Sequence, residues 1–216
     1  SSGVEFALTE FWQTENLIQP PQPFTSPGAV EKIVAISGSA SPWTASQIKW
    51  ALENGFQGIQ MDSVRLVDGN TQEAERNRLV DQAVQVISQG QSVLLYSALG
   101  PDDPKIASTK KQMTTSGLAP SNVGEILGAQ QGLVLKNILA KTGLHRVAVA
   151  GGDTCGHVLK QLSIYVLEFI IPLGIAAPLC RASSSNPQFD GMEIALKGGQ
   201  LGEVDFFRSV LKGKQG

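Results

Sequence analysis

The feature that most constrains the fold is a regular alternation of apolar runs and helical segments over residues 32–98. Short apolar runs bounded by turn residues are typical of buried strands, and they predict strands at residues 32–36, 56–61 and 92–98. Apolar side chains at three- and four-residue spacing predict helices between these strands, at residues 44–53 and 72–88. This β-α-β-α-β order predicts a parallel sheet with right-handed crossovers.

The rest of the chain first continues this alternation and then becomes richer in strands. Further helices are predicted at residues 121–139, 155–162 and 204–211, and a loop with a partial helix at residues 101–116. Further strands are predicted at residues 146–150, 166–170, 179–182 and 192–196. Ser121 and Asn122 offer caps for the longest of these helices, and Gly143 ends it. The expected fold class is α/β: a mostly parallel central sheet, helices on both faces, and a more β-rich C-terminal part.

The most apolar stretch, residues 164–179, contains Glu168, Pro172 and Pro178. It is too short to span a bilayer, so we predict buried strands there and expect no membrane partner. Residues 1–31 combine a glycine turn, a short apolar run and a proline-rich stretch, which predicts a linker and leading segment. One globular domain is expected over residues 32–216.

Charge and cysteine content argue against several functions. The chain has 17 basic and 19 acidic residues, a formal charge of −2, which disfavours nucleic acid as a partner because that binding needs a basic surface. Cys155 and Cys180 form no C-x-x-C pair and have no metal-type partners at helical spacing. A disulfide stays open, but two free thiols in a reducing cytoplasm are the plainer expectation. The sequence shows no basic leader, which also favours a cytoplasmic location.

Three glycine-rich turns follow predicted strands, and open α/β sheets bind ligands at the carboxyl ends of their strands. Residues 37–41, Ser-Gly-Ser-Ala-Ser, offer hydroxyls and bare amides ahead of a helix, which suits an anion. Residues 151–154, Gly-Gly-Asp-Thr, let the backbone approach a ligand while the next helix points its positive end at it. Residues 197–202, Lys-Gly-Gly-Gln-Leu-Gly, could close over a nucleotide. The plainer alternatives are a serine-capped helix, an aspartate N-cap and a flexible hairpin-like turn.

Asp153 is the candidate for chemistry in these turns, because it could accept a proton from an attacking hydroxyl or organise water on Mg²⁺. The sequence contains no P-loop, no dinucleotide fingerprint, no zinc-protease motif and no nucleophile elbow. His157 follows Cys155 by two residues, so on a helix the two side chains cannot face each other as a catalytic pair. Trp43 is expected to pack at the core or its rim, although its ring could stack on a base.

In this order and at these separations, the turns resemble the C-terminal nucleotide-binding domain of the four-carbon acid sugar kinase family, which includes 3-oxo-tetronate and threonate kinases. The resemblance covers essentially the whole chain, and the combination of motifs is specific although each motif is weak. The motifs are S-G-S-x-S at residues 37–41, T-x-x-Q-I at 44–48, G-G-D-T at 151–154, P-L-C-R at 178–181, L-K-x-G-x-x-G at 196–202 and D-F-F at 205–207.

The resemblance implies a two-domain ATP-dependent kinase whose product is a phosphorylated four-carbon acid. Residues 32–216 would be its nucleotide-binding domain; the N-terminal sugar-acid-binding domain is absent from the chain, so the isolated chain is expected to be inactive. ATP and Mg²⁺ are the expected cofactors. No metal ligand is assigned, and without a P-loop lysine Mg²⁺ would neutralise much of the phosphate charge. Carried over by position, the nucleotide-binding residues are Ser37, Gly38, Ser39, Ser41, Gly151, Gly152, Asp153, Thr154, Gly198, Gly199 and Gly202.

The role of Asp153 as catalytic general base is our own inference from its chemistry. Two departures from the family pattern bear on the site. Cys155 and His157 stand where small residues are usual, which could crowd the start of the helix, and residues 198–202 read Gly-Gly-Gln-Leu-Gly where Ser-Gly-Asn-Phe-Gly is usual. The alternative function is a non-catalytic nucleotide-binding or assembly module that kept the fold. A regulatory or secretion-associated protein is a third interpretation, which the composition does not support. The sequence leaves a homo-oligomer open.

Overall fold

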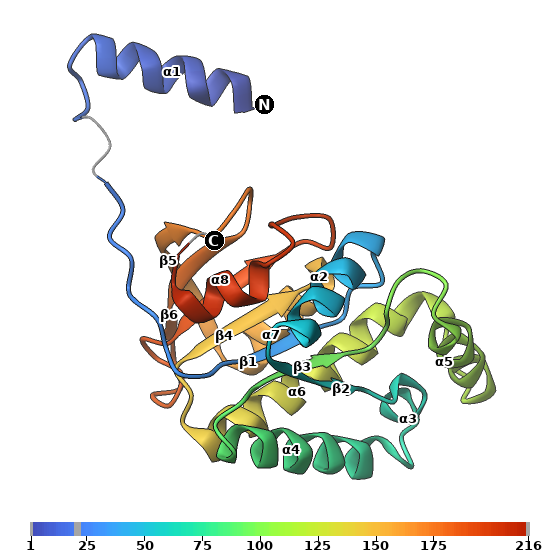
Figure 1. Ribbon diagram of the computed structural model, residues 1–216. Coiled ribbons are helices and arrows are strands. Elements are labelled where there is room, and N and C mark those ends of the chain that lie inside the picture. The colour runs from blue at the N-terminus through green and yellow to red at the C-terminus, as the bar shows by residue number, and fades with distance from the viewer. Residues whose placement is uncertain (1, 20–22, 215–216) are drawn as a thin grey trace.

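The computed structural model describes residues 2–19 and 23–214 of the 216-residue chain. Its centre is one seven-stranded sheet with the strand order β2-β3-β1-β4-β7-β6-β5 (Figure 1). The strands are β1 (Val34–Ser37), β2 (Phe56–Gln60), β3 (Ser92–Tyr96), β4 (Arg146–Ala150), β5 (Ile164–Pro172), β6 (Pro178–Ser184) and β7 (Glu193–Lys197). The first five strands in the sheet order pair in parallel, whereas β6 and β5 pair antiparallel. The predicted α/β class, its mostly parallel sheet and its β-rich C-terminal part are confirmed.

Helices cover both faces of this sheet, as the sequence predicts (Figure 1). The helices are α1 (Ser2–Thr14), α2 (Pro42–Glu53), α3 (Ser63–Val67), α4 (Gln72–Ser88), α5 (Pro104–Thr115), the 3-10 turn η1 (Pro120–Asn122), α6 (Val123–Thr142), α7 (Gly152–Gln161) and α8 (Phe206–Lys212). On one face, α2 and α8 bury Ile48, Phe206 and Phe207 against the strands. On the other face, α4, α6 and α7 bury a larger cluster that includes Leu79 and Ile138. The core is therefore two apolar layers separated by the sheet.

The strongest local signals set the element boundaries. Helix α4 and strand β4 have the predicted bounds, and Gly143 ends α6 in a left-handed conformation with φ of 66°. The predicted capping of α6 is only partly right: Asn122 is the N-cap residue, but its side chain accepts from the Ser121 hydroxyl at 3.2 Å and makes no capping hydrogen bond. Residues 104–115 form a full helix rather than a partial one, because the Asp103 carboxylate caps it by accepting from the Lys105 N–H at 2.9 Å.

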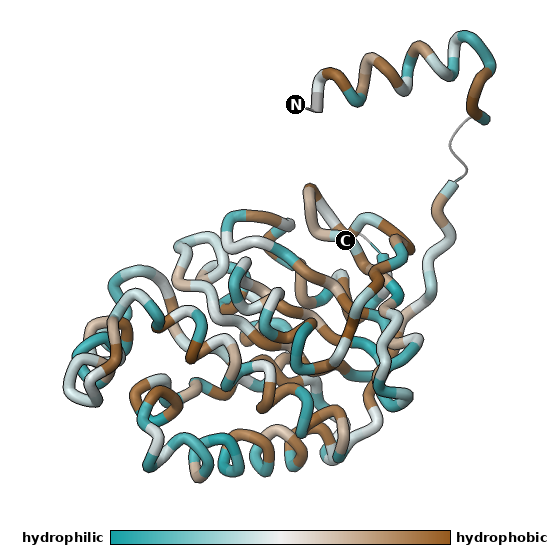
Figure 2. Tube along the Cα trace, turned by 180° about the vertical axis from the view of Figure 1, so that it is seen from behind, coloured by the Kyte–Doolittle hydropathy of each residue, from teal (hydrophilic) through white to brown (hydrophobic). Residues whose placement is uncertain are grey.

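The N-terminal segment corrects the prediction of a turn followed by a short apolar run. Residues 2–14 form helix α1, which lies apart from the domain (Figure 1). Hydrophobic and hydrophilic residues alternate along its length (Figure 2). Val4, Leu8 and Phe11 recur at helical spacing and are all exposed. Residues 23–30 have no regular secondary structure, as predicted for a linker, and residues 20–22 of the proline-rich stretch lie outside the described residues.

Strand β5 corrects a second prediction, that residues 164–179 form buried strands. Its side chains from Tyr165 to Phe169 are exposed, with 71% of Tyr165 accessible. Side chains of a strand point alternately to the two faces of the sheet, and over Tyr165 to Phe169 no described helix buries either face of this edge strand. Phe24 of the linker covers part of this strand, with its ring centroid 5.1 Å from that of Phe169.

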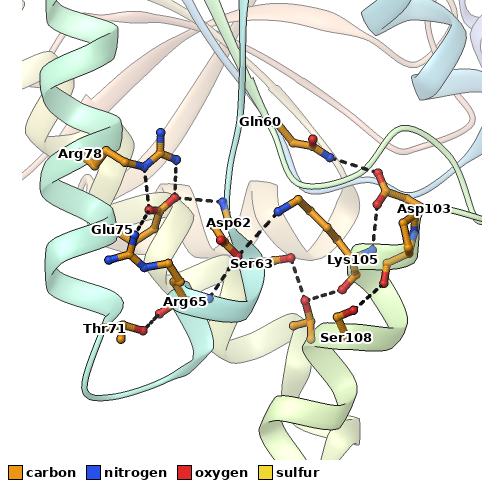
Figure 3. A network of polar contacts seen from close by, with 12 residues as sticks. Gln60, Asp62, Ser63, Arg65, Thr71, Glu75, Arg78, Asp103, Lys105 and Ser108 are labelled. Carbon is orange, nitrogen blue, oxygen red and sulfur yellow. Dashed lines mark hydrogen bonds and ion pairs between the residues drawn. The ribbon is translucent and has the colours of Figure 1, made fainter.

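A polar network holds α3, α4 and α5 together beyond the carboxyl ends of β2 and β3 (Figure 3). Glu75 is fully buried, accepts from the Asp62 N–H at 3.0 Å and pairs with Arg78 at 2.6 Å. Its hydrogen bond with Arg78 raises the pKa of that guanidinium. The Ser63 and Thr109 hydroxyls meet at 2.8 Å between α3 and α5. These contacts fix helices that line a cavity beside the first glycine turn.

Candidate functional site

The three glycine-rich turns meet at the carboxyl edge of three adjacent strands. They follow β1, β4 and β7, which are neighbours in the sheet. The Gly38 N–H donates to the Ala150 carbonyl at 3.0 Å, and the Gly151 N–H donates to the Lys197 carbonyl at 2.9 Å. The sheet itself therefore brings the first turn to the second and the second to the third.

Close packing explains why the first and second turns need glycine. A Cβ on Gly38 would overlap the Thr154 hydroxyl, and it would also collide with the Gln131 amide of α6. A Cβ on Gly151, whose φ is 121°, would lie 3.2 Å from the Ser39 nitrogen. The Thr154 hydroxyl itself donates to Gln131 Oε1 at 3.1 Å. The first turn therefore rests directly on the start of α7, a contact only glycine permits.

Side chains of α2 hold the third turn against the first. The Thr44 hydroxyl donates to the Gly199 carbonyl at 2.7 Å, and the Ser41 hydroxyl donates to the same oxygen. The Gln47 amide donates to the carbonyls of residues 201, 202 and 203, at 3.1, 3.1 and 2.7 Å. The Trp43 indole N–H donates to the Gly202 carbonyl at 2.8 Å. Sequence reasoning assigned no role to Thr44 or Gln47, although their three-residue spacing on a helix places both on one face.

The predicted site residues differ in their exposure. Ser37 is the last residue of β1, is fully buried, and its hydroxyl has no partner among the described residues. Ser39 is buried and accepts from the Ser41 N–H at 3.2 Å. Gly198 and Gly199 follow β7 and are partly buried, and a Cβ on Gly199 would lie 2.6 Å from the Ser39 hydroxyl oxygen. The structure thus brings all the predicted nucleotide-binding residues into one region.

Helix α7 presents its N-terminal end to this region. Gly151 is its N-cap residue, so the alternative of Asp153 as N-cap is wrong; Asp153 lies in the first turn and is exposed. The first intrahelical hydrogen bond runs from the Cys155 N–H to the Gly151 carbonyl at 2.9 Å. The N–H groups of residues 152–154 precede it and stay available to a ligand. An exposed helix N-terminus with glycine beside it attracts anions.

Neither departure at Cys155 or His157 crowds the start of α7. His157 packs where Gly128 of α6 leaves room, since a Cβ on Gly128 would lie 2.5 Å from the imidazole. Gly124 likewise leaves room for Asp153, because a Cβ on Gly124 would lie 3.1 Å from Asp153 Oδ2. Cys155 instead packs against the core, and burial raises the pKa of its thiol to about 11. It is therefore protonated at neutral pH and is no nucleophile.

Lys197 is a buried cation that sequence reasoning missed. It ends β7 with 2% of its surface exposed, and its ammonium donates to the Thr44 hydroxyl and to the Gly198 carbonyl, both at 3.1 Å. It takes part in none of the ion pairs found among the described residues. Burial lowers the pKa of Lys197 from 10.5 to about 8. The sequence signal was the lysine that opens the third turn, but the sequence alone cannot show that its side chain is buried.

A cavity of about 160 Å³ opens beside the first turn. Gly38 and Ala40 line it on one side, and Ser63, Ile106 and Leu127 line it on the others. Two wider hollows of about 540 and 570 Å³ lie away from the three turns, beside α4 and at the amino ends of β1 and β4. The cavity next to Gly38 is therefore in position to receive part of a ligand bound at the turns.

Two further properties concern the described residues only. No group of three or more histidine, cysteine, aspartate or glutamate side chains is placed there to hold a metal ion. No helix in the same part of the chain is long and apolar enough to cross a membrane. Cys155 and Cys180 are both free thiols and form no disulfide with each other, as the sequence favours.

Comparison with known proteins places this chain in a family. The family described as "nucleotide-binding C-terminal domain" matches residues 34–207, so the chain belongs to that family. More narrowly, it is the C-terminal domain of the four-carbon acid sugar kinase family, which confirms the resemblance seen in the sequence. The matched residues include all three glycine-rich turns.

Two curated relatives and one solved structure illustrate the relationship. A 3-oxo-isoapionate kinase of Paraburkholderia graminis is 39% identical over 99% of this chain and 46% of its own length. A 3-oxo-tetronate kinase of Pseudomonas savastanoi is 29% identical over 83% of this chain and 38% of its own length. A domain of unknown function from Bordetella bronchiseptica, solved with bound citrate as a domain-swapped dimer, has a TM-score of 0.65 at 16% identity and covers 87% of this chain and 43% of its own. That structure supports the fold alone. The chain spans less than half the length of each curated relative.

Proposed function

We propose that this chain is the ATP-binding half of a kinase that phosphorylates a 3-oxo sugar acid of the four-carbon type. The observation that carries the proposal is the convergence of the three glycine-rich turns on the N-terminus of α7. The names of both relatives combine a kinase with a 3-oxo sugar acid, which supports the reaction class and a 3-oxo acid as acceptor; the four-carbon length is supported by the name of the 3-oxo-tetronate kinase. The free thiols support the cytoplasm as its location.

The residues of the site fit the phosphates of a nucleotide. A Cβ on Gly38 or Gly199 would collide with neighbouring atoms, and one on Gly151 would lie only 3.2 Å from the Ser39 nitrogen, so the backbone forms a tight cradle. Gly152 has nothing within 4 Å of a Cβ position, which leaves the start of α7 open to a ligand. The amides of residues 152–154 would bind phosphate oxygens, with the hydroxyls of the first turn beside them. When bound, ATP supplies the phosphoryl group and Mg²⁺ compensates its charge.

Asp153 is our candidate for the general base. It is exposed at the first turn of α7, and its side chain lies against Gly124 at the start of α6, next to the cavity that Gly124 also lines. A carboxylate there can take the proton from an acceptor hydroxyl as that oxygen attacks phosphorus. The same carboxylate could instead orient water on Mg²⁺ through a hydrogen bond.

The sugar acid would be held by the remainder of a longer protein, and the isolated chain would then be inactive. The relatives are more than twice as long as this chain, and α1 and β5 each expose apolar residues suited to packing against another domain.

Calorimetric titration with Mg·ATP tests nucleotide binding. We expect saturable binding by the purified chain and its loss in Gly152→Val, because a branched side chain would stand where the phosphates approach. Gly152 is the suitable position because the apo structure has room for a side chain there, so the variant keeps its fold and its unfolding midpoint serves as the control. No saturable binding by the unchanged protein at millimolar nucleotide would contradict the proposal.

Asp153→Asn separates chemistry from binding in the longer protein. Kinase turnover should fall at least about 100-fold, the usual contribution of a general base, while the affinity for Mg·ATP stays within a few-fold. Unchanged turnover would remove Asp153 from the catalytic role. Binding without any turnover in the unchanged longer protein would favour the non-catalytic nucleotide-binding module.

A further inference from the structure

Lys197 carries a buried charge that the described residues do not balance. Its contacts are two neutral oxygen atoms, at Thr44 and Gly198, and the face of the Phe206 ring, whose centroid lies 5.6 Å away. No carboxylate pairs with it in the described part of the chain. A buried ammonium without a counter-ion is costly, so a residue with this environment calls for a functional explanation.

The location of Lys197 points to that explanation. Its carbonyl accepts from the Gly151 N–H, and its ammonium holds the Gly198 carbonyl, so one residue touches both the second and the third glycine turn. Through Thr44 it also reaches the start of α2, which follows the first turn. It therefore lies between the three segments proposed to surround a polyanion.

We propose that Lys197 is the resident cation of the nucleotide site, and that the phosphates of the bound nucleotide supply the counter-charge that the protein itself lacks. This inference rests on the proposed function. Lys197 would act in two ways: its charge attracts the phosphates, and its hydrogen bond to the Gly198 carbonyl holds the third turn. A buried lysine can act through its charge without touching the phosphates, because charges interact strongly across the low-dielectric interior of a protein. The sequence predicts that Mg²⁺ neutralises much of the phosphate charge; Lys197 would share that task.

A proton should enter the site with the nucleotide. Lys197 is about half protonated at a pH near its pKa of about 8, and nearby phosphates favour its charged form. Cys155 is the titratable group that the structure places beside it, and its thiol stays protonated at this pH. The other elements packed on Lys197 present the Thr44 hydroxyl, the Gly198 carbonyl and the Phe206 ring. Binding should therefore weaken as the pH rises above about 8.

Calorimetry of Mg·ATP binding at a pH near 8, in two buffers of different ionisation enthalpy, measures this uptake. We expect about 0.5 proton taken up per nucleotide by the unchanged protein. Lys197→Met should take up none and, at a pH near 7, should bind about tenfold more weakly. Lys49→Met, which removes an exposed lysine from α2, should behave like the unchanged protein.

Each outcome has a separate meaning. Nucleotide binding without proton uptake, or with equal affinity in Lys197→Met, would overturn the inference and leave the proposed function standing. Absence of binding by the unchanged protein would overturn both. Urea unfolding of the unliganded proteins provides a readout independent of the nucleotide. The folded pKa of Lys197 is below its unfolded value, so at this residue the unfolded chain binds more protons between about pH 8 and 10.5, and Lys197 contributes a rise in stability across that window. Cys155, whose folded pKa is raised from 9 to about 11, contributes an opposite fall above about pH 9 in both proteins, so the difference between the two pH profiles isolates Lys197. Lys197→Met should lack this rise; an identical pH profile in both proteins would show that Lys197 holds no buried charge.

Discussion

Strands β4 and β5 are both made largely of apolar residues, yet they lie in opposite environments. All five residues of β4 are buried, because β1 and β7 flank it and helices cover both of its faces. The side chains of β5 from Tyr165 to Phe169 are exposed at the edge of the same sheet. An apolar sequence therefore indicates that a strand suits burial, whereas its neighbours decide whether it is buried.

The difference also indicates where the rest of a longer protein would contact this domain. Long, apolar edge strands invite pairing with other chains, and α1 adds a second exposed apolar surface. By contrast, the three glycine turns, which follow β1, β4 and β7, are held by contacts within the domain itself. The comparison separates turns held in place by contacts within the domain from apolar surfaces that the described residues leave uncovered.

The largest effect should come from placing a charge in β4. Val149 is fully buried in the core cluster beneath α7. Val149→Asp should lower the free energy of unfolding by about 4 kcal/mol or more, because an unpaired carboxylate would be buried. The matched change Val166→Asp, at a β5 residue that is 48% exposed, should cost less than about 1 kcal/mol. Urea denaturation measures both, and equal losses would break the comparison between the two strands.

A smaller effect is expected at the amino end of β4. Arg146 is buried, pairs with Glu193 and donates to the Gly28 carbonyl at 2.7 Å. Arg146→Met should cost about 2–4 kcal/mol, since Glu193 and several carbonyls would lose their partner. Arg181→Met on β6, where the arginine is exposed, should change stability by no more than about 0.5 kcal/mol in the same assay. A neutral Arg146→Met would show that this buried contact contributes nothing.

The smallest change in stability is expected from removing the contact between the linker and β5. Phe24→Ala removes the edge-to-face contact with Phe169 and should cost about 0.5–1 kcal/mol. Phe6→Ala on α1, at a side chain that is 76% exposed, should leave the unfolding midpoint unchanged. If both variants behave alike, the linker does not stabilise β5 in solution.

Much of the fold follows from local patterns. The bounds of α4 and β4 were predictable because periodicity and glycine stops act over a few residues. Two further local signals agree with the structure: the spacing of Val4, Leu8 and Phe11 indicates helix α1, and Asp103 before a proline indicates the start of α5. The exposure of β5 could not be predicted, because it depends on sheet order, which local periodicity does not specify.

The site also combines features that local sequence predicts with features that depend on distant elements. The glycine turns were recognisable as motifs, and the structure shows why several of them must be glycine. The contributions of Gln47, Gln131 and Lys197 were not predictable, because each depends on an element distant in sequence. For example, the Gln131 side chain leaves no room for a Cβ on Gly38, although Gln131 lies on a helix about ninety residues further along the chain.

Arg146 also joins the two ends of the domain. Its guanidinium donates to the Gly28 carbonyl before β1 and to the Val210 carbonyl in α8, while the Val30 N–H donates to the Leu211 carbonyl at 3.0 Å. The chain thus enters and leaves at one corner, at the amino end of β4 and away from the glycine turns. Such a domain is topologically almost a closed loop. In the proposed longer protein, a neighbouring domain would therefore be tethered at this corner, at the end of the sheet opposite the glycine turns.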